Sequence, residues 1–348
     1  MSRVITYAEA ICEATDQCLA ADANVYLMGL GVPDPKGVFG TTLGLKERHG
    51  ARVMDMPTSE NAMTGVAIGA AIVGMRPILT HQRLDFALLS IEQLVNQAAK
   101  FHYMFGGEAS VPLVVRMVIG RGWGQGPQHS QSLQAWFAHV PGLKVVMPAT
   151  AYDAKGLLIA AVEDDNPVIY LEHRWLHGTK GEVPEEPYRV PIGEARRLRE
   201  GEDITLVGIS YMTIEAMRAA EVLAGHGISA EVIDLRSLRP FDAETIIASV
   251  RRTGRLLVAD TGGVTGGFGG EIVSQIVERA FDRLICPPRR IGLPDIPTPT
   301  SPALARHYYP RAGDIVTAVM EMLDRGPVAM PPADGPLDVP DPGFTGPF

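Results

Sequence analysis

The chain has 348 residues, of which 46% are hydrophobic and 20% charged, a balance typical of a globular protein with about two domains. Its formal net charge of −9 argues against a nucleic-acid partner, because such binding depends on clustered Lys and Arg. The apolar runs end before the roughly 18 residues that a membrane span needs, and the N-terminus lacks the apolar core of a secretory signal. Three cysteines without metal-ligand spacing indicate a reducing, cytoplasmic environment.

The first half of the sequence alternates between helical and strand periodicity. The predicted elements are, in chain order, helix 7–21, strand 25–29, helix 62–73, strand 76–80, helix 86–104, strand 111–116, strand 143–147, helix 151–163 and strand 168–172. This alternation predicts right-handed βαβ units and a mostly parallel sheet flanked by helices. We expect this first domain to span residues 1–178.

A second α/β series follows a segment rich in Pro, Glu and Gly. Residues 179–202 are the predicted linker, and the second domain is expected over 203–326. Its predicted elements are strand 204–208, helix 212–226, strand 230–234, helix 243–250, strand 255–260 and helix 270–281. Residues 327–348 are Pro-rich and are expected to form an extended tail. The chain is therefore predicted to be an α/β protein of two domains.

Two residues of the first domain are candidates for chemistry. Glu60 starts a segment of Ala, Gly and apolar residues, where a buried acid is costly unless something specific binds it. The simpler interpretation is an acid at a helix N-terminus, which the helix dipole stabilises by about 0.3–1 kcal/mol. Phe86 follows a strand and opens a helix, where open α/β sheets bind ligands. The simpler interpretation is a core aromatic residue.

A histidine and a glycine-rich segment complete the candidates. His129 ends a loop with several glycines and has a side chain that exchanges protons near neutral pH, although a surface or helix-capping histidine fits the same pattern. Residues 262–270 lie between a strand and a helix, where they either cradle a phosphate or form a tight structural turn. The sequence has no P-loop lysine, nucleophile elbow or His-based metal pattern, so hydrolase and metalloenzyme functions lack support.

Seven ordered motifs carry a family resemblance. They lie at residues 57–60, 92–100, 128–132, 139–146, 153–157, 233–240 and 294–299. Over about residues 4–325 the chain resembles the β subunit of the E1 component of 2-oxo acid dehydrogenases, a branch of the transketolase-like thiamine diphosphate enzymes. The resemblance implies a transketolase-like pyrimidine-binding domain followed by a transketolase C-terminal-like domain.

The resemblance also implies roles for four residues. The family's matching glutamate hydrogen-bonds the pyrimidine N1′ of thiamine diphosphate and favours the tautomer whose nitrogen takes the proton from thiazolium C2. Glu60 would have this role, and Phe86 would stack on the pyrimidine. Gln82 would line the cofactor site, and His129 would match the active-site histidine that handles the substrate and acyl transfer.

A missing motif implies a partner chain. The Gly-Asp-Gly motif that holds Mg²⁺ and the diphosphate in single-chain relatives is absent from this sequence. In two-chain E1 enzymes the α subunit carries it, so we expect an α2β2 assembly in which this chain alone is inactive. A structural K⁺ site is common in the family. Its backbone ligands would map near Leu113, Ala161, Asp164 and Asn166.

Several residues depart from the family pattern. Leu30 stands where an acid is common, and Leu84 replaces an aromatic residue. Arg83 could bind a carboxylate, phosphate or sugar hydroxyl, or form a surface ion pair, and Trp123 fills a loop position that is usually small. These departures indicate a pocket retuned for another substrate.

The favoured function is decarboxylation of a 2-oxo acid with transfer of the acyl unit to a lipoyl-type acceptor. One alternative is a split transketolase-like or acyloin-type enzyme that moves a two-carbon ketol unit to a carrier protein or a sugar. A non-catalytic scaffold is the other alternative, and the presence of Glu60, Phe86 and His129 argues against it.

Overall fold

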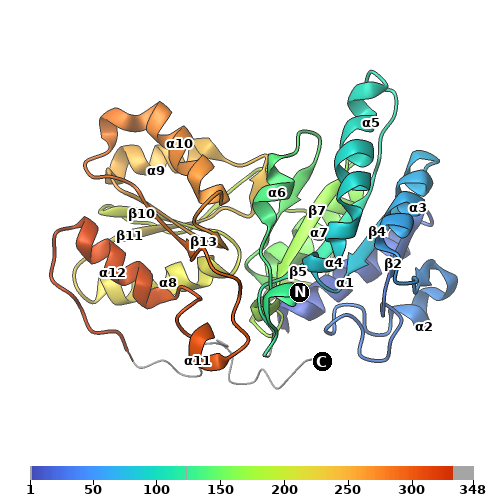
Figure 1. Ribbon diagram of the computed structural model, residues 1–348, viewed down its shortest axis with the longest axis horizontal. Helices are drawn as coiled ribbons and strands as arrows, with labels where there is room; N and C mark the ends of the chain where they lie inside the picture. The colour runs from blue at the N-terminus through green and yellow to red at the C-terminus, as the bar shows by residue number, and fades with distance from the viewer. Residues whose placement is uncertain (1, 123, 332–348) are drawn as a thin grey trace. The chain divides into compact units, whose positions relative to one another are not determined.

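The computed structural model describes residues 2–122 and 124–331, and the chain divides into two compact units at Ile192 and Gly193. Figure 1 shows the first unit in blue to green and the second in yellow to red. Residues 124–127 group with the second unit. The predicted tail lies outside the described residues from 332 onward, and residues 327–331 form neither helix nor strand.

The sheet of the first unit contains six mutually parallel strands in the order β6-β7-β5-β4-β2-β3. Their bounds are β2 (Val25–Gly29), β3 (Val53–Met54), β4 (Arg76–His81), β5 (Val114–Ile119), β6 (Lys144–Val146) and β7 (Val168–His173). Every residue of β2, β5 and β7 is buried, as expected for parallel strands covered on both faces.

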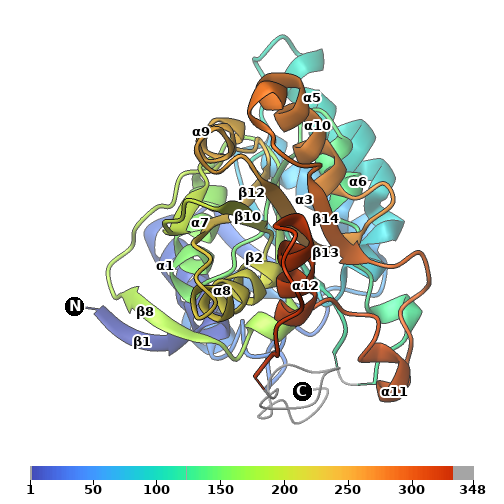
Figure 2. The same ribbon diagram turned by 90° about the vertical axis from the view of Figure 1, so that its left-hand side faces the viewer.

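The described residues of this unit form seven α-helices. They are α1 (Tyr7–Ala21), α2 (Leu45–His49), α3 (Glu60–Ile72), α4 (Leu84–Ala87), α5 (Ala99–Met104), α6 (Gln134–His139) and α7 (Ala151–Glu163). Thr6 caps α1 in a reciprocal capping box with Glu9, which satisfies two otherwise orphaned N–H groups. Helix α1 packs along α7 (Figure 2). Strand β1 (Ser2–Thr6) pairs antiparallel with β8 (Lys180–Pro184).

The second unit has a five-stranded sheet in the order β14-β13-β10-β11-β9, in which only β9 runs antiparallel. The strands of this unit are β9 (Arg196–Arg199), β10 (Ile204–Gly208), β11 (Ala230–Asp234), β12 (Ser237–Arg239), β13 (Leu256–Gly263) and β14 (Arg289–Leu293). Its helices are α8 (Tyr211–Ala224), α9 (Ala243–Thr253), α10 (Phe268–Ala280), α11 (Pro302–Ala305) and α12 (Ala312–Met322). The predicted fold class, two mostly parallel sheets flanked by helices, is confirmed.

Two of the differences between the predicted and the observed elements have a clear physical cause. The predicted strand 111–116 begins three residues later, because Pro112 lacks an N–H and Leu113 N bonds back to Val111 O in a turn. The predicted helix 86–104 is not one α-helix. It contains α4, a 3₁₀ turn at Leu88–Ser90, a π-helix at Gln93–Ala98 and α5. Apolar periodicity does not distinguish these hydrogen-bond patterns.

The predicted linker also contains regular structure. Strand β8 occupies its first residues and β9 its last, so only residues 185–195 lie between regular elements. Both strands are short and partly exposed, which explains why their sequence lacks a clear strand pattern.

Candidate active site

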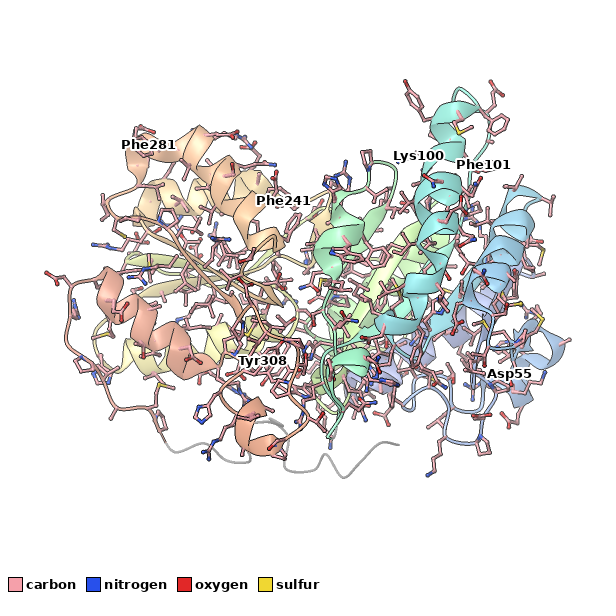
Figure 3. The ribbon with its side chains drawn as sticks, viewed as in Figure 1. Asp55, Lys100, Phe101, Phe241, Phe281 and Tyr308 are labelled. Carbon is pink, nitrogen blue, oxygen red and sulfur yellow. The ribbon has the colours of Figure 1, made fainter. Side chains whose placement is uncertain are left out.

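The loops that follow four neighbouring strands meet at one edge of the first sheet. Strands β3, β2, β4 and β5 are parallel neighbours, so their carboxyl ends lie together, where α/β sheets bind ligands. Leu30 follows β2, and Asp55, labelled in Figure 3, follows β3. Gln82 follows β4, and the segment that carries His129 follows β5. Two of the predicted cofactor and substrate residues, Gln82 and His129, therefore lie in loops that start at this edge.

Hydrogen bonds tie these loops to one another. Gln82 Nε2 donates to Leu30 O at 3.0 Å, and Gly31 N donates to Asp55 Oδ1 at 2.9 Å. Gly31 has φ of +71°, and a β-carbon there would lie 2.7 Å from Gln82 Nε2. Glycine is therefore required at position 31 for both backbone and space. Gln82, which the sequence assigns to the cofactor site, is held by the backbone of the neighbouring loop.

Glu60 is the first residue of α3, and its side chain is buried, with the residue only 5% exposed. Its Oε2 atom has no hydrogen-bond partner among the residues that the structure describes. Thr64 Oγ1 donates to Glu60 O at 2.7 Å and lies within hydrogen-bond distance of Ser90 Oγ, at 2.8 Å, which joins the first turn of α3 to the 3₁₀ turn Leu88–Ser90. A buried oxygen without a partner costs about 1–3 kcal/mol, so this position suits an acid that bonds to a ligand's ring nitrogen.

Phe86 and His129 lie in contact. Their ring centroids are 5.2 Å apart and their planes are nearly perpendicular, at 86°, a favourable edge-to-face arrangement. Phe86 lies on α4 and is only half-buried, whereas His129 is exposed at the end of the 3₁₀ turn Pro127–His129. A half-buried ring fits a binding surface better than the interior of the core. The two residues thus present an aromatic face and a titratable imidazole side by side.

Asp85 is a residue of this site that the sequence does not single out. Its Oδ1 accepts hydrogen bonds from Gln131 N at 3.3 Å and from Gln131 Nε2 at 2.8 Å. Burial raises the pKa of the Asp85 carboxyl, and the two bonds from Gln131 oppose that rise. The only sequence signal is an acid beside Phe86 in the first turn of a helix, which is also the pattern of an ordinary helix-start acid.

Arg83 is buried rather than at the surface. It is 2% exposed, its Nη1 donates to Gly120 O at 2.7 Å, and its guanidinium carbon lies 5.3 Å from the Phe39 ring centre. The alternative of a surface ion pair is therefore wrong, because this side chain is enclosed by the site's own loops. Trp123, also predicted to shape the pocket, lies outside the described residues.

A buried ionic cluster lies in the middle of the same sheet. Arg116 Nε on β5 donates to Glu172 Oε1 on β7 at 2.7 Å, and His177 Nε2 lies 3.2 Å from Glu172 Oε2. Burial alone would raise the pKa of Glu172, but Arg116 and His177 together lower it to about 2. Burial also lowers the pKa of His177 to about 4. These groups form an internal ion pair beside a neutral histidine.

The four residues predicted as K⁺ ligands gather at the opposite edge of the sheet. Leu113 precedes β5, Asn166 precedes β7, and Ala161 and Asp164 lie at the end of α7. Leu113 O accepts from Val168 N at 2.9 Å, which holds the first two segments together. The four positions are therefore close in space and distant from Glu60 along the strands.

Two side-chain cations already contact this corner. Arg76 Nη1 donates to Asp164 O at 3.2 Å, and Lys144 Nζ forms an ion pair with the Asp164 carboxylate. Asn166 N donates to Asp164 Oδ1 at 2.9 Å. The oxygens of Asp164 are thus partly satisfied by protein groups.

The glycine-rich segment 262–270 forms a tight turn between β13 and α10. A β-carbon at Gly267 would lie 1.9 Å from Gly263 O, and Val264 N donates to Leu293 O at 3.0 Å. Glycine is required for this close approach of backbone to backbone, which supports the structural interpretation of the segment.

Two other features are absent from the part of the chain that the structure describes. Residues 2–122 and 124–331 contain no group of three or more His, Cys, Asp or Glu that could hold a metal ion. Over the same part of the chain, no helix is both long and apolar enough to cross a membrane.

Comparison with known families defines the class of protein. Residues 3–179 match the pyrimidine-binding domain of transketolase, and residues 193–315 match the transketolase C-terminal domain. Among solved structures, a chain described as split gene transketolase, inactive β4 tetramer, superimposes with a TM-score of 0.76 at 26% identity, covering 92% of this chain and 99% of that one. The fold is therefore that of a transketolase-like enzyme component.

Curated relatives define the family within that class. The chain is 43% identical over 336 residues to the β subunit of acetoin:2,6-dichlorophenolindophenol oxidoreductase of Cupriavidus necator, covering 94% of this chain and 99% of the relative. It is 42% identical over 322 residues to the mitochondrial pyruvate dehydrogenase E1 component subunit β-2 of Oryza sativa, covering 91% and 86%. The chain belongs to the E1 β subunits of thiamine-diphosphate-dependent 2-oxo acid dehydrogenases, which are heteromeric and work with an α subunit. This confirms the resemblance carried by the seven motifs.

Proposed function

We propose that this chain binds the aminopyrimidine end of thiamine diphosphate in an α2β2 enzyme that decarboxylates a 2-oxo acid and passes the acyl unit to a lipoyl-type acceptor. The observation that carries the proposal is the buried Oε2 of Glu60, which has no partner among the described residues. An acid in that state at a ligand-binding sheet edge is suited to hold a proton against a ring nitrogen.

The residues of this chain have distinct tasks in the proposal. Bound thiamine diphosphate supplies the electron sink that 2-oxo acid decarboxylation requires. Glu60 binds the pyrimidine and holds a proton at Oε2, and Phe86 offers its ring for stacking. Gln82, fixed by Leu30 O, lines the cofactor. His129 gives or takes a proton at the substrate as a general acid or base.

The partner chain supplies what this sequence lacks. Because the Gly-Asp-Gly motif is absent, the α subunit is expected to hold Mg²⁺ and the diphosphate, and each active site needs both chains. Support for K⁺ comes from the positions of Leu113, Ala161, Asp164 and Asn166, which lie in the chain segments that lead into β5 and β7 at one corner of the sheet. The cations of Arg76 and Lys144 at that corner mean that an ion would add to existing contacts.

The test is reconstitution with an α chain that carries Gly-Asp-Gly. The complex is assayed against pyruvate, branched 2-oxo acids, acetoin and ketose phosphates, with a lipoyl domain or an artificial electron acceptor. Turnover of a 2-oxo acid only when both chains are present supports the proposal. Full activity of this chain alone would refute the two-chain requirement.

A split transketolase or acyloin-type enzyme is the second candidate. It is favoured by the solved split gene transketolase, with its TM-score of 0.76, and by the polar segment His81-Gln82-Arg83. Turnover of ketose phosphates, with a sugar or carrier protein as the acceptor of a two-carbon unit, would select it. A non-catalytic scaffold would show no turnover of any member of the panel despite α binding.

A further inference from the structure

The segment that carries His129 is tied at both ends to the start of α4. At its first residue, Gly120 O accepts a hydrogen bond from Arg83 Nη1 at 2.7 Å. Past the histidine, Gln131 donates to Asp85 Oδ1 through both its backbone N and its side-chain Nε2. Arg83 and Asp85 are separated by one residue, so one short stretch at the start of α4 binds the segment at two positions.

The segment needs such ties because it has little structure of its own. Between β5 and α6 the described residues form only the 3₁₀ turn that ends at His129, and alternate residues from 120 to 126 are glycine. Glycine loses more conformational entropy on ordering than any other residue. Contacts from outside the segment must therefore fix the imidazole.

The same turn of chain also touches His129. Phe86 follows Asp85 directly on α4, and its ring contacts the His129 ring at 5.2 Å. A shift of Gln131 away from Asp85 would move the histidine relative to the ring expected to contact the cofactor. The position of the imidazole and the position of the stacking ring are thus set by neighbouring residues.

We propose that Asp85 is a positioning residue for His129: by gripping Gln131 with one carboxylate oxygen, it holds the imidazole against Phe86 in the geometry used for substrate. This inference rests on the proposed function only for the role of His129 in the reaction. The hydrogen bonds between Gln131 and Asp85 are a property of the folded chain and do not depend on that function. Gln131 donates to one carboxylate oxygen through two groups, its backbone N and its side-chain Nε2, which favours a fixed geometry over a transient contact.

Two substitutions of Asp85 distinguish the hydrogen bonds to Gln131 from other effects of the side chain. Asp85→Asn keeps Oδ1 as an acceptor for both Gln131 donors, whereas Asp85→Ala removes it. A misplacement of about 1 Å costs up to ~10²-fold in rate, so Asp85→Ala is expected to lower kcat by ~10- to 100-fold. Asp85→Asn is expected to stay within about threefold of the parent, because the hydrogen bonds survive. KM should change little in either variant.

The kinetic test is a double-mutant cycle in the reconstituted complex. The assay uses whichever of pyruvate, acetoin or ketose phosphate the parent complex turns over. If Asp85 acts through His129, then adding Asp85→Ala to His129→Ala causes no further loss of kcat. Hydrogen–deuterium exchange at thiazolium C2 should be unchanged in Asp85→Ala, because that step depends on Glu60. Additive losses, or an Asp85→Asn variant as slow as Asp85→Ala, would overturn the proposal.

A second measurement needs no substrate. Deuterium uptake by the peptide that covers residues 128–133 is followed by mass spectrometry, and Asp85→Ala should raise it severalfold at short times while Asp85→Asn should not. The matched control is Glu92→Ala, which removes an exposed carboxylate that accepts from Gln97 Nε2 at 3.1 Å and should leave that peptide unchanged. Equal deuterium uptake in Asp85→Ala and the parent would refute the claim that Asp85 fixes this segment through Gln131. Failure of the proposed function would give a different result. In that case the parent complex itself would show no hydrogen–deuterium exchange at thiazolium C2.

Discussion

Replacing Arg116 by Met tests the buried cluster in the first sheet. Arg116 and Glu172 are 0% and 1% exposed, and their Nε and Oε1 atoms are 2.7 Å apart. The pKa of Glu172 falls from 4.5 to about 2 in this setting. At about 1.4 kcal/mol for each pKa unit, this corresponds to about 3 kcal/mol of folding stability at neutral pH. Loss of one partner from a buried pair costs about 3–5 kcal/mol, so the two values agree.

The assay is urea unfolding followed by tryptophan fluorescence. Trp136 and Trp175 lie in the first unit, so their fluorescence reports the unfolding of that unit. Arg116→Met should lower its free energy of unfolding by about 3 kcal/mol. The control is Arg189→Met, which removes an ion pair with Glu163 that is about half-exposed on both sides and should leave the free energy of unfolding nearly unchanged.

The pH dependence gives the result that would refute this reasoning. A carboxyl whose folded pKa is lowered adds stability above its unfolded value, and that stability is lost as the pH falls. The stability that Glu172 adds to the parent is complete above about pH 4.5 and is lost toward pH 2, so the difference between parent and Arg116→Met should shrink as the pH falls from 7 toward 2. A loss below about 1 kcal/mol at pH 7, or one that does not depend on pH, would contradict the account.

Two further predictions concern the cofactor and the pH. Phe86→Ala should weaken thiamine diphosphate binding by the α/β complex about tenfold, because ring stacking contributes about 0.5–1.5 kcal/mol beyond buried area. Calorimetry checks this, with Phe86→Tyr as the control, and an unchanged Kd in Phe86→Ala would oppose stacking. Burial lowers the pKa of His81 from 6.5 to about 4. Between these two pH values His81 is protonated in the unfolded chain but not in the folded one, so the free energy of unfolding falls as the pH drops from 6.5 to about 4. Between pH 7 and pH 5 His81 should account for a loss of about 2 kcal/mol, absent in His81→Phe. A profile of equal slope in parent and variant would contradict the assignment.

The helices and strands that depend on local sequence signals could be predicted. Helices α1 and α7 and strands β2, β10 and β11 have the predicted bounds, because their apolar periodicity and caps are local signals. The β1–β8 and β9–β11 pairs were not predicted. They depend on partners far along the chain, and their exposed residues carry no clear alternation.

The candidate site divides in the same way. Glu60, Phe86 and His129 were candidates from their places near predicted strands, helices and a glycine-rich loop, and the family resemblance supplied their roles. The role inferred for Asp85 depends on Gln131, 46 residues later in the chain. The burial of Arg83 depends on Phe39 and Gly120, which only the folded sheet brings together. Residue type and local pattern do not contain such contacts.

The most direct test of the central claim is hydrogen–deuterium exchange at C2 of thiamine diphosphate, measured by NMR in the α/β complex. The claim is that Glu60 activates a cofactor whose other end the α subunit holds. The parent complex should exchange fast, and each chain alone should exchange no faster than the free cofactor. Glu60→Gln should assemble normally but slow the exchange by at least ~10²-fold, the low end for loss of an acid–base group. Exchange at the parent rate in assembled Glu60→Gln would contradict the account.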